Sequence, residues 1–381
     1  MKSKICGMLN IEFPLVAFSH CRDVVAAVSR AGGFGVLGAT AFTPEQLEVE
    51  LAWIDAHVDD KPYGLDVLIP ENLPLNSEKG LTSEGLAQRI PQAHRTFVNG
   101  LLAAHGIEAP DGAYAGRAGA PPPFSPEQAM KLLEVAFRHP IRLIANALGV
   151  PPPEMVALAR DHGVPLAALA GAKEHALRLA AAGVDIVVAQ GGEAGGHCGE
   201  VSTLVLVPEV VRALKAAGHS IPVLAAGGIM TGRQMAGCMA MGAAGVWTGS
   251  VWLATPEAET SEIFREKLVA AGSRDTVRSK SRTGKYSRQL RSGWTDAWEG
   301  EDSPGALPMP MQSLVSEPAL RSIEASAAAG NPEARKLVTY FVGQGVGLVD
   351  GVKSSRAVVA EFMDEFAEAV SEMSAWLDDE A

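Results

Sequence analysis

One histidine follows the densest glycine cluster of the chain. Residues 190–197 read Gln-Gly-Gly-Glu-Ala-Gly-Gly-His and come directly after the apolar run 185–189. Glycines let main-chain amides come within hydrogen-bonding reach of a flat or anionic ligand. His197 would stand at the end of a strand, and because histidine titrates near neutral pH it suits proton abstraction from a weak carbon acid. The competing interpretation is a solvated turn residue.

Two further apolar runs end in small residues. Residues 222–226 lead into Gly227 and Gly228, and residues 245–248 lead into Gly249 and Ser250. If these runs are the seventh and eighth strands of a barrel, the amides at their carboxyl ends form the usual phosphate cradle of that fold. The pattern therefore predicts a phosphorylated cofactor, with tight turns that hold no ligand as the alternative.

Three other patterns carry weaker signals. Residues 278–291 contain six basic and no acidic side chains, which predicts either an anion site or a surface strip paired with carboxylates. Residues 33–38 match GxGxxG, but the strand begins inside the motif, so a helix end is the better interpretation. The pairs at 20–21 and 197–198 are both His-Cys, which is not a known metal-ligand spacing, so we expect no metal.

Composition restricts the class of protein. The chain has 381 residues, of which 47% are hydrophobic and 20% charged, so it can bury a large core. Its net charge of −12 argues against nucleic acid as a partner. No apolar stretch has the length of a signal peptide or a membrane helix, and the four cysteines lack CxxC spacing. We therefore expect a cytoplasmic protein with reduced thiols and no membrane contact.

Short apolar runs, each followed by a helix-like stretch, recur up to about residue 256. This alternation predicts parallel strands with crossover helices, and most runs lack period-two patterning, as expected when both faces of a strand are buried. Eight such units predict an α/β fold of the closed (β/α)8 TIM-barrel type. The predicted strands are residues 14–18, 35–39, 63–69, 141–148, 165–170, 185–190, 222–226 and 245–248.

The barrel is expected to comprise residues 1–69 and 141–256. Residues 70–140 form an insertion after strand three, on the side where barrel enzymes place their chemistry, so a lid or substrate wall is the hypothesis there. Residues 257–381 form a C-terminal helical extension that completes the substrate side and packs on the barrel. Its last helix, near 354–377, has the apolar spacing of an amphipathic helix.

At these residues the chain resembles the nitronate monooxygenase family, formerly called 2-nitropropane dioxygenases. Flavin-dependent relatives of that family include enoyl reductases and NAD(P)H:quinone reductases. The resemblance spans nearly the whole chain and rests on residues 14–16, 31–35, 190–197, 225–228, 245–250, 281–284 and 291–298.

The resemblance implies FMN at the top of the barrel. Gln190 and Gly195 would lie near the isoalloxazine and ribityl groups, and His197 falls where the family keeps its catalytic base. Two departures from the family pattern are residues 17–20, which read Ala-Phe-Ser-His, and Asp66 in place of an asparagine. The expected cofactor-binding residues are Ala17, Phe18, Asp66, Gln190, Gly191, Gly195, Gly196, Gly227, Gly228, Trp247, Thr248, Gly249 and Ser250.

The implied activity is the oxidation of alkyl nitronates or nitroalkanes with dioxygen. His197 would take the proton next to the nitro group or polarise a nitronate, and FMN would carry the redox step. One alternative is an FMN-dependent NAD(P)H reductase of an enoyl thioester or a quinone. Another is a flavin-binding or ligand-sensing barrel without turnover. The expected partners are a small-molecule substrate and dioxygen, and whether the chain forms a homo-oligomer stays open.

Overall fold

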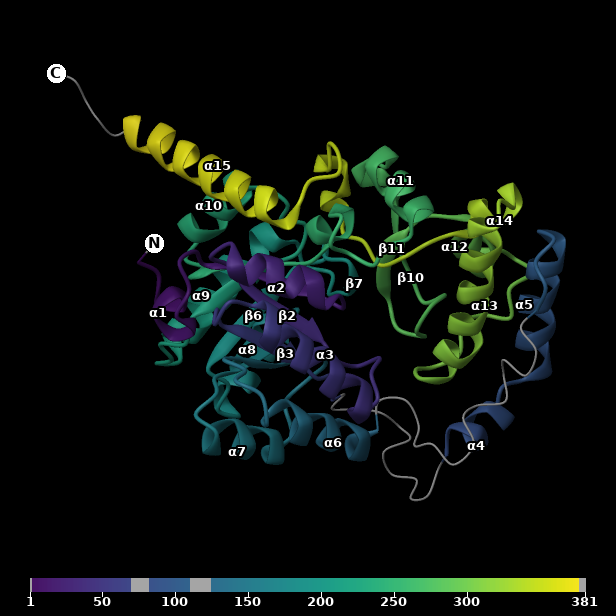
Figure 1. Ribbon diagram of the computed structural model, residues 1–381, viewed down its shortest axis with the longest axis horizontal. Helices are drawn as coiled ribbons and strands as arrows, with labels where there is room; N and C mark the ends of the chain where they lie inside the picture. The colour runs from purple at the N-terminus through teal and green to yellow at the C-terminus, as the bar shows by residue number, and fades with distance from the viewer. Residues whose placement is uncertain (1, 70–81, 110–124, 377–381) are drawn as a thin grey trace.

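Eight parallel strands form a closed barrel in a computed structural model that describes residues 2–69, 82–109 and 125–376 (Figure 1). Neighbouring strands follow one another around the ring, with the last strand pairing with the first, so the predicted TIM barrel is confirmed. The barrel strands are β1 (Leu15–Ser19), β2 (Phe34–Gly38), β3 (Tyr63–Asp66), β4 (Ile144–Asn146), β5 (Leu166–Ala170), β6 (Ile186–Gln190), β8 (Val223–Ala226) and β9 (Gly245–Thr248).

Helices cover the outside of the barrel, and both faces of its strands are buried. One apolar cluster fills the interior and includes Phe34 and Trp247, while a larger one lies between the strands and the helices. This double burial explains why the strands read as continuous apolar runs. The outer helices are α2 (Arg22–Arg30), α3 (Pro44–His57), α6 (Pro126–Ala136), α7 (Pro153–Asp161), α8 (Lys173–Ala181), α9 (Thr203–Ala216) and α10 (Gly232–Ala240).

A short N-terminal helix, α1 (Lys4–Leu9), contributes to the interior cluster. Ile5 and Leu9 are fully or almost fully buried and pack with the side chains inside the barrel. The hydroxyl of Ser3 accepts hydrogen bonds from the amides of Ile5 and Cys6, which caps the first turn. The Ser3 hydroxyl also donates to the carbonyl of Ala244, directly before β9, so this helix lies at the amino-terminal end of the strands.

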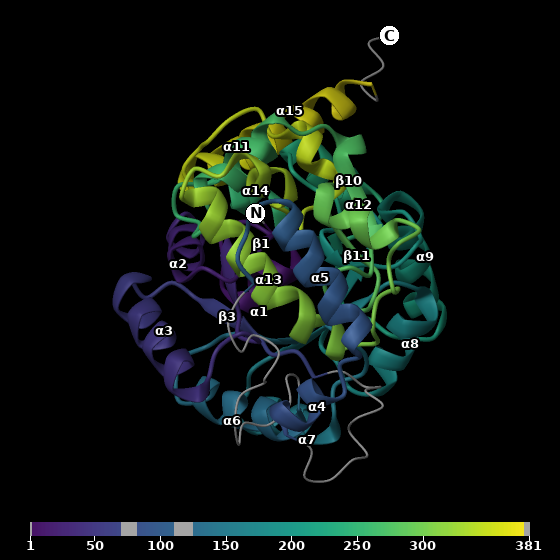
Figure 2. The same ribbon diagram turned by 90° about the vertical axis from the view of Figure 1, so that its right-hand side faces the viewer.

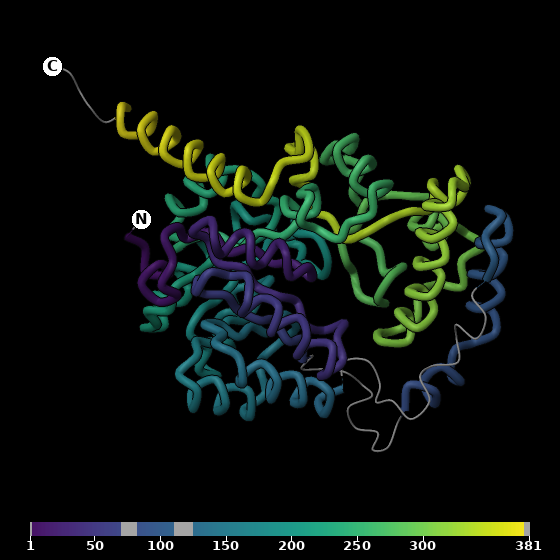
Figure 3. Tube along the Cα trace, viewed as in Figure 1, coloured from purple at the N-terminus to yellow at the C-terminus, as the bar shows by residue number. Residues whose placement is uncertain are grey.

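A second body stands beside the barrel and has its own apolar core (Figures 1 and 2). In Figure 3 the blue helix α5 runs alongside the green-yellow α13, although some 200 residues separate them in the chain. The body contains α4 (Ser83–Gln88), α5 (Gln92–Ala104), α11 (Glu262–Ala270), α12 (Gly293–Glu299), α13 (Met311–Ala328) and α14 (Pro332–Leu337). The expected insertion 70–140 thus divides, because α6 packs on the barrel helix α3 while α4 and α5 join the second body.

A small antiparallel sheet of the second body reaches back to the barrel. Its strands are β10 (Thr276–Ser279), β11 (Ser287–Leu290) and β7 (Gly196–His197), in the order β10-β11-β7. Since β7 belongs to the glycine-rich segment after β6, main-chain pairing fixes that segment to the second body.

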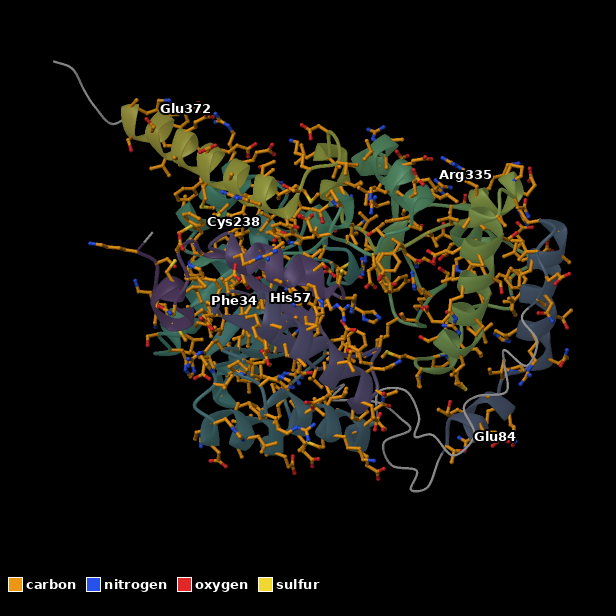
Figure 4. All side chains as sticks on the ribbon, viewed as in Figure 1. Phe34, His57, Glu84, Cys238, Arg335 and Glu372 are labelled. Carbon is orange, nitrogen blue, oxygen red and sulfur yellow. The ribbon has the colours of Figure 1, made fainter. Side chains whose placement is uncertain are left out.

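The C-terminal helix α15 (Ser355–Ala375) lies across α10 and α2 on the outside of the barrel. A carboxylate oxygen of Glu365 accepts the amide of Gly232 at 2.7 Å, and Arg233 pairs with Glu372 at 2.7 Å. Figure 4 shows Glu372 near the C-terminal end of α15, and Cys238, which belongs to α10, below this helix. Within the described residues, no helix is long and apolar enough to span a membrane.

Candidate functional site

A cavity of about 1260 Å³ lies between the carboxyl ends of the barrel strands and the second body. Ala17 and Gly191 do not line it: Ala17 is fully buried, and a Cβ at Gly191 would come within 2.1 Å of the Thr203 hydroxyl. The other residues expected at the site do line the cavity, namely Phe18, Asp66, Gln190, Gly195, Gly196, His197, Gly227, Gly228, Trp247, Thr248, Gly249 and Ser250.

Glycine main chain forms much of one wall. Gly227 and Gly228, directly after β8, have φ values of 110° and 70°, which side-chain-bearing residues rarely adopt. A Cβ added to Gly249 or Gly196 would meet no atom within 4 Å and would project into open space. The main chain of this glycine wall, called the cradle below, is therefore open to direct approach by a ligand in the cavity.

Polar contacts fix the loops that form this wall. The Glu193 carboxylate accepts the amide of Thr203 at 2.9 Å and lies 2.9 Å from its hydroxyl, which also reaches the Gly227 carbonyl at 3.0 Å. Arg288 of β11 donates from Nε and Nη2 to the Gly192 carbonyl at 3.0 and 2.8 Å. These contacts join the turns after β6 and β8 to each other and to the second body.

His197 lies in the short strand β7, opposite Ser287 of β11, a pairing that the sequence did not predict. Its Nε2 atom is 2.8 Å from the Thr283 hydroxyl, and that hydroxyl also lies 3.1 Å from the Lys285 carbonyl. Burial, with a smaller contribution from the Lys285 charge, lowers the pKa of His197 to about 4. The imidazole is therefore neutral at physiological pH.

Two other titratable groups stand on the barrel rim. Asp66 ends β3 and is 4% exposed, and burial raises the pKa of its carboxyl to about 7. His20 follows β1, and its Nδ1 lies 3.1 Å from the Gly38 carbonyl. Burial lowers the pKa of His20 as well. Within the described residues, no group of three or more His, Cys, Asp or Glu side chains is arranged to hold a metal.

The opposite wall comes from residues that sequence reasoning missed. Tyr340 and Phe341, before the short helix Gln344–Leu348, line the cavity together with Glu317 of α13. Arg282 lies 4.8 and 4.6 Å from the centres of the Tyr340 and Phe341 rings. It also forms a two-point ion pair with Glu317, with N–O distances of 2.8 and 3.2 Å. No local motif marks these aromatic residues.

The segment 343–347 does carry a signal, because it reads Gly-Gln-Gly-Val-Gly. The Gly343 amide donates to the Ser250 hydroxyl at 2.8 Å, and the Gln344 amide donates to the Glu193 carbonyl at 2.8 Å. A Cβ at Gly345 would come within 2.6 Å of the Gly228 carbonyl. These glycines thus allow the main chain of residues 343–347 to pass close to the main chain of the cradle.

The basic stretch 278–291 does not act as one surface. Arg282 and Arg288 are buried in the contacts described above, and Arg291 pairs with Asp296 at 2.8 Å on the surface. Arg278 lies 3.6 Å from the carboxylate of Glu200. Lys285 forms no ion pair within the part of the chain that the structure describes.

The family model described as nitronate monooxygenase matches residues 2–365. A Mycobacterium tuberculosis protein, named only provisionally as a monooxygenase, is 53% identical over 98% of this chain and 98% of its own length. Nitroalkane oxidase from Streptomyces ansochromogenes is similar in structure, with a TM-score of 0.77, 25% identity, and coverage of 97% of this chain and 99% of that one. A mutant of FabK from Thermotoga maritima gives a TM-score of 0.69 at 25% identity, covering 99% of both chains.

Proposed function

Because this chain belongs to the nitronate monooxygenase family, we propose that it is an FMN-dependent oxidoreductase that oxidises alkyl nitronates with dioxygen. The observation that carries the proposal is the position of His197, a neutral imidazole beside a glycine-walled cradle in one large cavity. The family relation supports the reaction class, and the cavity supports the assignment of roles to individual residues.

The described residues fit FMN. The main chain at Gly227, Gly228 and Gly249, with Ser250, would hold the phosphate, since all four residues line the cavity and a Cβ at Gly249 would meet no atom within 4 Å. Gln190, Gly195 and Gly196 would lie along the ribityl and ring portions. Phe18 and Trp247, whose rings stack at 6.5 Å between centroids, would form an apolar floor. Ala17 and Gly191 would act from behind this surface by setting the turns.

FMN supplies the electron transfer to and from the substrate and dioxygen. The task of the protein is to bind the nitronate, orient it and exclude water. Tyr340 and Phe341 supply an apolar wall for this purpose, and Arg282 with Glu317 fixes that wall through the ring contacts and the ion pair.

His197 would hold a proton at a defined atom. If the Thr283 hydroxyl donates to the Lys285 carbonyl, it accepts a hydrogen bond from His197 Nε2–H, and Nδ1 carries the lone pair. A pKa of about 4 makes this nitrogen a weak base at neutral pH. A substrate that is already a nitronate suits it better than a neutral nitroalkane, because hydrogen bonding and orientation are then sufficient.

Anaerobic mixing tests the proposal. We expect the purified protein to be yellow and its flavin absorbance near 450 nm to bleach on mixing with ethyl nitronate, roughly 100-fold more slowly after His197→Ala. The variant should still bind flavin, which its spectrum reports. A colourless protein that cannot be reconstituted with FMN would contradict the cofactor, and an unchanged bleaching rate in the variant would contradict the role of His197.

The structural similarity to FabK favours a second candidate function, that of an FMN-dependent NAD(P)H reductase of an enoyl thioester or a quinone. The same experiment separates the two. Rapid bleaching by NADH or NADPH with none by nitronate would replace the proposed reaction with this one. Reoxidation of the reduced flavin by air, an enoyl thioester or a quinone would then identify the acceptor.

A further inference from the structure

A side cavity of about 420 Å³ opens next to the main one, at the carboxyl ends of β4, β5 and β6. The two cavities share five residues in their walls, namely Ala147, Leu148, Leu169, Gln190 and His197. His197 therefore lies between the two cavities and borders both, so a ligand bound in the side cavity lies next to this imidazole.

Permanent positive charges converge on the side cavity from three separate elements. Arg178 comes from α8, Arg278 from β10, and Lys285 from the turn before β11. Among the described residues lining it, Glu200 is the one carboxylate, and its side chain is 82% exposed. The chain as a whole has a net charge of −12, whereas the described lining of the side cavity has a net positive charge.

The main cavity is lined by more acidic than basic side chains. In the described part of the chain, two permanent cations line it, Lys131 and Arg321. Among the residues that the structure describes, five side chains with a carboxyl group line it, namely Glu45, Asp66, Glu259, Glu317 and Glu324. An anionic portion of a ligand is thus favoured in the side cavity, and the uncharged or reactive portion in the main one.

The side cavity is too large for a lone ion. Its volume falls in the range of about 300–1,000 Å³ typical of organic ligands. Gly149, Gly171 and Gly199 come from three different turns and form part of its wall. A Cβ at Gly171 would approach the Gly199 Cα at 3.4 Å, so the main chains of these turns lie close together beside the cations. Closely packed main chain beside guanidinium groups is suited to phosphate oxygens.

We propose that the side cavity binds the phosphate-bearing tail of an organic ligand whose other end reaches His197. The inference rests on the proposed function only for the chemistry at that reactive end. Because Glu200 lies 3.6 Å from Arg278, the three cations and this carboxylate give the described lining a net charge of about +2. This charge matches the two or more negative charges of a phosphate ester or diphosphate better than the single charge of a carboxylate. Two sources share this chemistry, the nucleotide tail of an acyl thioester and the diphosphate of a nicotinamide dinucleotide.

Calorimetric titration of the flavin-loaded protein with ADP tests the site. We expect binding that Lys285→Gln weakens at least five-fold and that weakens further between 50 and 200 mM NaCl. Arg291→Gln is the matched control, because Arg291 belongs to the same basic stretch but pairs with Asp296 outside both cavities. It should change the affinity less than two-fold. Absence of ADP binding, or equal weakening by both variants, overturns the proposal.

Titrations with coenzyme A and with NADPH distinguish the two sources. The true source should bind more tightly than ADP, should lose affinity in Lys285→Gln, and should perturb the flavin absorbance because its other end reaches the main cavity. Tight binding that Lys285→Gln leaves unchanged contradicts the site. Failure of nitronate to bleach the flavin would count against the proposed reaction alone, since none of these binding measurements requires turnover.

Discussion

The Nε2 atom of His197 lies 2.8 Å from the Oγ1 atom of Thr283, a residue 86 positions further along the chain. Pairing between β7 and β11 brings the two segments together, with His197 opposite Ser287. The segment after β6 thus supplies the imidazole of His197. Thr283 of the second body orients this ring and fixes which ring nitrogen carries the proton.

Replacing Thr283 should therefore slow the reaction without removing the cofactor. Thr283→Val deletes the hydroxyl at nearly constant volume, and we expect kcat for nitronate to fall about 10-fold, the equivalent of one neutral hydrogen bond. Thr283→Ser keeps the hydroxyl and should restore kcat to within about two-fold. Steady-state oxygen consumption measures both variants. Equal losses in the two would indicate a packing role instead.

The pH profile should show an acid limb near pH 4, because burial keeps His197 neutral down to that pH. An ordinary histidine would give a limb near 6.5. The measurement is kcat/KM for ethyl nitronate from pH 3 to 8 in an Asp66→Asn background, which removes a cavity-lining carboxyl whose pKa is about 7. A limb centred between 6 and 7 in that background would contradict the assignment.

Asp66→Asn should also change the pH dependence of stability. The carboxyl has its pKa raised to about 7, so the folded state holds its proton more tightly than the unfolded state. The stability linked to that proton is complete below pH 3.8 and is lost as the pH rises through 7. We expect the variant to gain on the order of 1–3 kcal/mol over the parent between pH 5 and pH 8, measured by urea unfolding. A constant difference would mean that Asp66 is already ionised at pH 5.

Gly249→Ala should weaken FMN binding at least 10-fold while leaving the melting temperature of the apoprotein within about 2 °C, because the added Cβ meets nothing but the cavity. Gly237→Ala provides the matched control. Gly237 lies in α10, outside the cavity, and an added Cβ there also meets no atom within 4 Å. This control should keep the FMN affinity and gain roughly 0.5–1 kcal/mol in stability. Equal FMN affinity in the two variants would argue against the cradle.

The barrel could be predicted from the sequence because each of its strands has a pattern that is confined to a few neighbouring residues. Strands buried on both faces, such as β6 and β8, read as unbroken apolar runs, and each is followed by a helix. The cavity-lining glycines could also be predicted, since Gly227 and Gly228 directly follow β8 and Gly249 directly follows β9.

Contacts between segments that lie far apart in the chain could not be predicted from the sequence. A two-residue strand such as β7 has no periodicity, and its partner β11 lies about 90 residues away. Tyr340 and Phe341 acquire their position from Arg282 and from the fold of the second body, which no spacing reveals. The insertion 70–140 was recognised as a unit in sequence, but its helices are divided between two cores in space.

The shared core of α5 and α13 has a consequence for synthesis. Residues such as Val98 and Leu102 of α5 are buried against C-terminal partners including Val315 and Ile323 of α13. A ribosome that adds about 5–20 residues per second delivers those partners roughly 10–40 seconds later. During that interval α5 has an uncovered apolar face, while the remaining barrel strands are completed. Chaperone capture of nascent chains should therefore concentrate on this helix.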